Sequence, residues 1–178
     1  TLAEILKKLG ERAALGALWQ RTSEAWKTTL PPRNKENTID DETKKLGDDR
    51  TAVQNLIKAP VLDYASGLGV LEGTQDFITK ATRKVDAFDA MVDDRAEIEK
   101  AITALDKPTL QPLLAAELTR VKAYKKDVTD LLMAGDTNPA ISRAKEGGKV
   151  ATSFIALVKL CETAVAKRRD WVDARRVL

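Results

Sequence analysis

Two residue types on which much enzyme chemistry depends, histidine and cysteine, are almost missing from this chain. It has no histidine and a single cysteine, Cys161. Without histidine, the Ser-His and Cys-His nucleophilic systems, histidine general acids and di-iron bundles built on Glu-x-x-His are all excluded. One cysteine and no histidine also cannot supply the usual nitrogen and sulfur ligands of zinc. We therefore expect no catalytic residue, no cofactor and no zinc site.

A run of carboxylates in the middle of the chain is the remaining candidate for a metal site. Asp86, Asp89 and Asp93 recur at spacings that place them on one face of a helix. Clustered carboxylates can hold magnesium or calcium through oxygen. A solvated acidic face that pairs with basic neighbours explains the same residues, and we favour that interpretation. Whether this face binds a cation stays open at the level of sequence.

Residues 146–152, with the sequence EGGKVAT, only partly match a nucleotide-binding loop. Such a loop needs a strand before it and a serine or threonine directly after Gly-Lys, to meet phosphate and magnesium. Here Val150 occupies the hydroxyl position and the first glycine of the motif is absent. We interpret the segment as an irregularity in a helix.

Tryptophans and basic residues supply the candidates for partner binding. Trp19 and Trp26 lie one heptad apart, so they project from one side of a helix as interface anchors or, more commonly, as core residues. The C-terminal run is the one place where cations and an aromatic residue are interleaved. It could contact nucleic acid, an anionic membrane or an acidic protein, or simply favour a helix C-terminus. The candidate partner-binding residues are Trp19, Trp26, Lys167, Arg168, Arg169, Trp171, Arg175 and Arg176.

The charge of the chain is small overall but unevenly spread. The formal net charge is +3, with −5 in residues 61–106 and +6 in residues 107–178. Docking of acidic helices against basic ones inside one bundle explains this better than an external anionic partner. Nucleic acid is therefore conceivable as a partner but not indicated.

Apolar residues recur at helical spacing along most of the chain, and prolines and glycines separate the segments. We expect one long helix over residues 2–30, ended by Pro31-Pro32. Residues 31–47 are polar and predict a mobile segment with at most one short helix. A short helix should then begin at Asp48 or Asp49 and stop at Pro60.

The second half of the pattern begins with a glycine-rich stretch. Residues 64–73 (YASGLGVLEG) predict a loop or loose turn, and Thr74 should start the next helix. Asp94 with Glu97 resembles a capping box, so a new helix is expected there, with a continuous helix as the alternative. Further helices are expected from Thr109 to Gly135 and from Asn138-Pro139 onward, the last one weakened at residues 147–148.

These apolar stripes must be buried against one another, because isolated helices of this length are marginal in water. The sequence predicts an all-α fold, an antiparallel up-and-down bundle of four to six coiled-coil-like helices with a mobile polar segment near residues 31–47. One domain over residues 1–178 is expected, and an excised part of a longer protein is the alternative. With no apolar run long enough to span a bilayer, we expect a soluble chain, either cytoplasmic or exported without a classical signal peptide.

The leading functional hypothesis is a non-catalytic helical interaction or scaffold module that binds a protein partner or self-associates, since no catalytic site is visible. One alternative is an effector or toxin-type domain with a carboxylate-based site. The other is nucleic-acid binding through the basic C-terminal helix. The Ala-rich chain with short polar linkers is typical of a bacterial protein.

Overall fold

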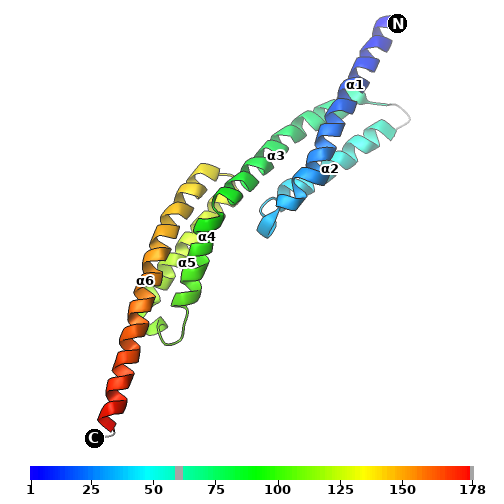
Figure 1. Cartoon of the computed structure of the whole chain (residues 1–178). Helices are drawn as coiled ribbons and strands as arrows, with labels where there is room; N and C mark the ends of the chain where they lie inside the picture. Colours follow the sequence, from blue (N-terminus) through cyan, green and yellow to red (C-terminus); the bar gives the residue numbers. More distant parts are fainter. Residues whose placement is uncertain (59–61, 177–178) are drawn as a thin grey trace. The chain divides into compact units, whose positions relative to one another are not determined.

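The protein is built from helices throughout the part of the chain that the computed structural model describes, residues 1–58 and 62–176. No strand occurs in those residues, and the predicted all-α bundle class is confirmed (Figure 1). No helix of the described residues has a stretch both long and apolar enough to cross a membrane. The Pro60 helix stop predicted from sequence lies outside the described residues.

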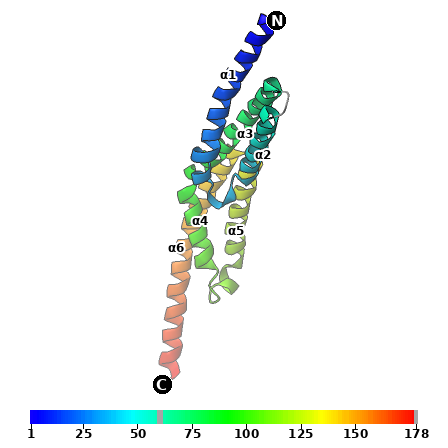
Figure 2. The same ribbon diagram turned by 90° about the vertical axis from the view of Figure 1, so that its right-hand side faces the viewer.

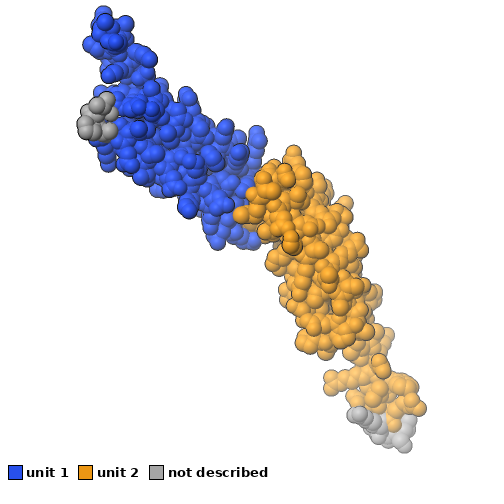
Figure 3. All heavy atoms as spheres, turned by 180° about the vertical axis from the view of Figure 1, so that it is seen from behind, with its two compact units in different colours: residues 1–86 blue, residues 87–178 orange. Residues whose placement is uncertain are grey.

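The chain forms two compact units, residues 1–86 (unit 1) and 87–178 (unit 2) (Figure 3). Each unit has its own clusters of buried apolar side chains. The boundary falls within helix α3 (Tyr64–Ala90), which continues through it without interruption. That residues 1–178 behave as one domain stays a prediction.

In unit 1, helices α1 (Leu2–Glu24) and α2 (Asp40–Lys58) pack with the larger part of α3. The helix predicted over residues 2–30 is confirmed in extent as far as Thr29, but its type changes after Glu24. There the chain widens into a π-helical turn, Ala25–Thr29, and then tightens into a 3₁₀ turn at Pro31–Arg33. The Leu30 N–H donates to the Ala25 carbonyl at 3.0 Å. The fully buried apolar side chains of unit 1 are Leu30, Ile39, Leu46, Val53, Leu71, Ala81 and Val85.

Two segments predicted to be irregular are largely helical. Helix α2 begins at Asp40 rather than Asp48 or Asp49, because acidic residues in its first turn suit the positive end of the helix dipole and Leu46 is fully buried. The predicted loop at residues 64–73 is also wrong, since α3 runs through it. A Cβ atom at Gly67 would lie 3.3 Å from Leu15 Cδ1, so glycine here lets α3 pass close to α1.

Unit 2 contains the end of α3 and helices α4 (Val92–Leu105), α5 (Gln111–Ala134) and α6 (Thr137–Arg176). The break before α4 comes at Met91 (φ −102°, ψ 2°), three residues before the predicted cap at Asp94. The N-cap position of α5 is occupied by Leu110 rather than by Thr109. The predicted end at Gly135 is confirmed, because this residue adopts the left-handed conformation, φ 88°.

The predicted weakening of the last helix at residues 147–148 is wrong, because α6 is continuous there. The two glycines allow close helix packing instead. A Cβ at Gly147 would lie 2.8 Å from Ile98 Cδ1, and one at Gly148 would lie 3.2 Å from the Cα of Asp94. The buried apolar residues around this crossing are Ile98, Ala101, Leu105, Leu118, Val121, Tyr124 and Ala151.

Candidate protein-interaction sites

The two tryptophans of α1 and its π-turn are half-buried in unit 1 and hold an arginine between them. The Arg50 guanidinium carbon lies 5.6 Å from the Trp19 ring centroid and 4.7 Å from that of Trp26. Both distances suit cation–π attraction. The buried Arg50 Nε has no hydrogen-bond partner among the described residues. These indoles therefore already contact their own unit, and a role for them in partner binding stays a prediction.

Beside this arginine, α2 and α3 bury a set of charged groups. Lys84 Nζ lies 2.7 Å from Glu42 Oε1, and the two side chains are only 8% and 11% exposed. Asp49 accepts hydrogen bonds from the Thr74 hydroxyl at 2.9 Å and from Lys45 Nζ at 2.6 Å. The bond to Asp49 raises the pKa of Lys45 above its ordinary value. This polar cluster joins α2 to α3.

The N-terminal half of α1 carries an exposed apolar stripe. Leu2, Ile5, Leu6 and Leu9 are 73%, 58%, 59% and 54% exposed. Their spacing places them along one side of the helix. A capping box begins this helix: the Glu4 N–H donates to the Thr1 hydroxyl at 3.4 Å, and the Thr1 N-terminal ammonium donates to Glu4 Oε2 at 2.6 Å. Figure 2 shows these turns running on beyond the neighbouring helices of unit 1.

The acidic residues singled out in the sequence lie in different surroundings. Asp86 belongs to unit 1, where its Oδ1 lies 2.7 Å from Arg33 Nη2. Asp93 lines a shallow hollow of about 320 Å³ in unit 2 that also contains Lys100 and Lys149. In the described part of the chain, no three acidic, cysteine or histidine side chains are grouped closely enough to hold a metal ion. The hollow also contains Asp94 and Glu97, and Lys100 Nζ lies 2.5 Å from Glu97 Oε1, which suits the interpretation of a paired acidic face.

The predicted basic run forms the last turns of α6. Lys167, Arg168 and Arg169 are exposed, and Trp171 is 60% exposed. The Arg175 guanidinium carbon lies 4.7 Å from the Trp171 ring centroid. The side chain of Arg176 lies outside the described residues. The structure thus brings Trp171 and Arg175 together on a surface that unit 2 leaves uncovered.

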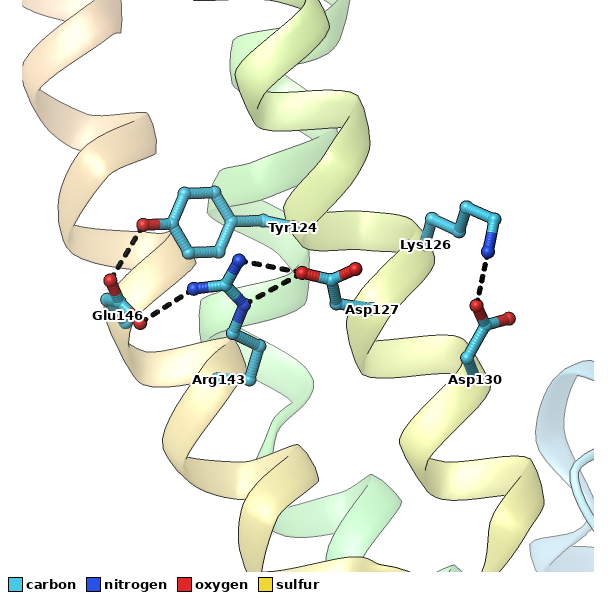
Figure 4. Close-up of polar contacts among 6 residues, drawn as sticks. All are labelled: Tyr124, Lys126, Asp127, Asp130, Arg143 and Glu146. Carbon is cyan, nitrogen blue, oxygen red and sulfur yellow. Dashed lines mark hydrogen bonds and ion pairs between the residues drawn. The ribbon is translucent and has the colours of Figure 1, made fainter.

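A polar cluster on α5 and α6 was not predicted from the sequence (Figure 4). Arg143 donates from Nε and Nη2 to Asp127 Oδ2, at 3.0 and 2.7 Å, and from Nη1 to Glu146 Oε2, at 2.9 Å. Its guanidinium carbon stands 4.0 Å from the Tyr124 ring centroid. The Tyr124 hydroxyl donates to Glu146 Oε1 at 2.8 Å. These contacts link α5 to α6, which indicates a structural role.

Hydrogen bonds set the charge states in this cluster. The Tyr124 hydroxyl, followed by Arg143, lowers the pKa of Glu146 below its ordinary value. The bond to Asp127 raises the pKa of Arg143 further. On the outer side of α5, pairing with Asp130 raises the pKa of Lys126. None of these shifts moves a group toward neutral pH, where a general acid or base would be poised.

One signal in the sequence could have revealed the buried charges. Glu42, Leu46, Asp49 and Val53 follow one another in steps of four and three, so two carboxylates stand within an apolar helical stripe. A charge at such a position predicts a buried partner. No comparable signal marks Arg50, because its contacts come from α1 and the π-turn.

In comparisons with known proteins, no protein-family model, curated protein or solved structure matches the chain.

Proposed function

We propose that this chain is a non-catalytic interaction module that acts through protein–protein contacts, with the exposed stripe of α1 as a self-association surface. The observation that carries the proposal is the exposure of Leu2, Ile5, Leu6 and Leu9 by more than half. Burying a leucine-sized side chain contributes about 1.5–3 kcal/mol. Burying these four side chains together therefore offers a substantial driving force for association.

The chemistry of the stripe favours a second copy as the occupant. Its four large side chains are aliphatic, and a two-fold pairing of the same helix places apolar side chains against apolar side chains. The neighbouring charges include both signs, and Lys7 and Glu11 already lie 3.7 Å apart on the same helix. Pairing two copies therefore does not bury a row of like charges.

Sedimentation equilibrium over a concentration series tests this proposal. We expect the wild-type chain to form a dimer and the Leu6→Gln/Leu9→Gln variant to remain monomeric, with helical circular dichroism unchanged. Leu113→Gln is the matched control, because Leu113 is 63% exposed in α5 of unit 2. A wild-type chain that stays monomeric at every concentration would contradict self-association through α1, and so would equal weakening by the control.

The carboxylate-based and nucleic-acid hypotheses stay predictions without support from the described residues. The acidic residues form no group that could hold a metal ion there. The basic run of α6 interleaves its cations with exposed apolar side chains, which phosphate contacts do not use.

A further inference from the structure

The last turns of α6 extend beyond the helices that cover the rest of it (Figures 1 and 2). Lys107, in the α4–α5 connection, pairs with Glu162 of α6 at 2.6 Å. After Glu162 every described side chain of α6 is exposed. In the described part of the chain, about four helical turns at the end of α6 are therefore exposed.

The face left uncovered is a continuation of the face that builds the core of unit 2. Leu157, Val158 and Cys161 pack against the core of that unit. Seven residues make about two turns of a helix, so Ala164, Arg168 and Arg175 continue the line of Leu157 and Cys161. The exposed apolar side chains beside this line are Leu160 (68%), Val165 (42%), Trp171 (60%) and Val172 (37%).

Cations lie on both sides of these turns, whereas the acidic residues lie on one side only. Arg168 and Arg175 lie in the middle of the apolar face, at positions that a packed helix pair would fill with side chains from its partner. Asp170 and Asp173 lie on the far side, where Arg169 Nε is 3.9 Å from Asp173 Oδ2. The centre of the uncovered face is thus basic and has no acidic side chain of its own.

We propose that this face of α6, over residues 162–176, binds an acidic amphipathic helix of a partner protein. The partner lies where α4 and α5 would lie if they were longer, and its carboxylates meet Arg168 and Arg175 while its apolar residues cover Val165, Trp171 and Val172. Unit 2 contains an ion pair between its own helices at a half-exposed position, where Lys125 Nζ lies 2.5 Å from Glu99 Oε1. The inference rests on the proposed function, because it assigns a partner class to the same interaction module.

Other occupants fit this face less well. A second α6 would place Arg168 and Arg175 against arginines, which is unfavourable in a desolvated interface. If this face bound a bilayer, the arginines in its middle would be buried in the membrane. Membrane-surface helices instead carry their cations on the polar face.

The probe for this proposal is a synthetic amphipathic helix of about three heptads, with leucine at the core positions and glutamate beside them. A matched peptide carries lysine in place of glutamate. Titration calorimetry measures the binding of each peptide to the full chain. The Arg168→Glu/Arg175→Glu variant removes the basic centre, and Lys159→Glu is the control because Lys159 lies on the opposite side of α6.

We expect the wild-type chain to prefer the glutamate peptide, with an affinity that falls as salt is added. The double variant should lose about tenfold or more of this affinity and should prefer the lysine peptide, while Lys159→Glu stays within about twofold of wild type. No binding, equal binding of both peptides, or binding of anionic vesicles or duplex DNA in place of the peptide would overturn the inference. If α1-dependent dimers form while the peptide does not bind, the inference fails and the proposed function stands.

Discussion

The pair formed by Lys84 and Glu42 shows what a single buried residue contributes to unit 1. Both side chains are almost fully enclosed, and the second carboxylate oxygen of Glu42, Oε2, is buried with no hydrogen-bond partner among the described residues. Desolvating two charges is expensive, and their attraction offsets that expense only while both are present. The pair therefore specifies the packing of α2 on α3 more than it adds net stability.

Removing one partner of this pair should destabilise the folded protein strongly. We expect Lys84→Met to lower the free energy of unfolding by about 3–5 kcal/mol, because it leaves the Glu42 charge buried and uncompensated. Urea denaturation followed by circular dichroism measures the change. The Glu42→Leu/Lys84→Met double variant should recover most of the loss, since it replaces both charges by apolar groups. A double variant as unstable as Lys84→Met alone would contradict this account.

The Glu146 carboxylate makes unit 2 sensitive to acid in a defined direction. Its folded-state pKa lies below the ordinary value, because it accepts hydrogen bonds from Tyr124 and Arg143. A lowered folded pKa stabilises the protein above the unfolded pKa, about 4.3, and the stabilisation disappears as the pH falls through the folded value. We expect wild type to be more stable than Glu146→Gln at neutral pH and the difference to shrink below about pH 4.3.

Thermal melting of the two proteins between about pH 7 and about pH 3 measures this difference. Glu72→Gln, which neutralises an exposed glutamate of α3 in unit 1, is the control. An equal and equally pH-dependent effect of Glu72→Gln would show that loss of negative charge alone, rather than the Tyr124 and Arg143 contacts, is responsible.

At the scale of elements, the crossing of α4 and α6 depends on two glycines. A Cβ at Gly148 would lie 2.5 Å from Asp94 Oδ1 and 3.2 Å from the Asp94 Cα, which is backbone and cannot turn aside. By contrast, a Cβ at Gly69 in α3 would meet nothing within 4 Å. The same substitution at these two positions should therefore have opposite effects.

We expect Gly148→Ala to lower the free energy of unfolding by about 1–3 kcal/mol, because α4 must move away from α6. Gly69→Ala should raise it by about 0.5–1 kcal/mol, because alanine has the higher helix propensity and causes no clash. Chemical denaturation of both variants gives the two values. Stabilisation by both substitutions would show that the close approach of the helices does not restrict residue size.

Helix type and bundle class could be predicted because apolar side chains recur at helical spacing from Phe77 to Val92 and again through α5 and α6. Element boundaries could not, because they depend on contacts between distant residues. Gly67 predicts a loop locally, yet Leu71 beside it is fully buried and Gly67 lies against Leu15. The free energy gained by burying one leucine side chain exceeds the cost of placing a glycine in a helix, which is about 1 kcal/mol relative to alanine.

The candidate surfaces were predictable only in part. The sequence places Leu2, Ile5, Trp19 and Trp26 on one heptad-like track, and periodicity alone cannot tell which turns of a helix have neighbours. In the structure the first turns of that track are exposed and the tryptophans contact Arg50. The basic C-terminal run was visible from composition, whereas its position beyond the ends of α4 and α5 required the structure.

At the scale of the whole molecule, α3 is the element shared by both compact units. Val85 lies in the core of unit 1 and Phe88, one turn later, in the core of unit 2. Unfolding either unit would release the turn of helix that carries the core residue of the other. Because helix formation is cooperative over neighbouring residues, we expect this shared turn to couple the stabilities of the two units.

We therefore expect a single urea transition for the whole chain. Tryptophan fluorescence reports mainly on unit 1, since Trp19 and Trp26 are half-buried there and Trp171 is largely exposed, whereas circular dichroism reports on all helices. The two midpoints should coincide, and Gly148→Ala, which acts in unit 2, should lower both. A fluorescence midpoint that does not move while the dichroism curve becomes biphasic would show two independent domains. In that case, the continuous helix at residues 85–88 would not be enough to make the two units unfold together.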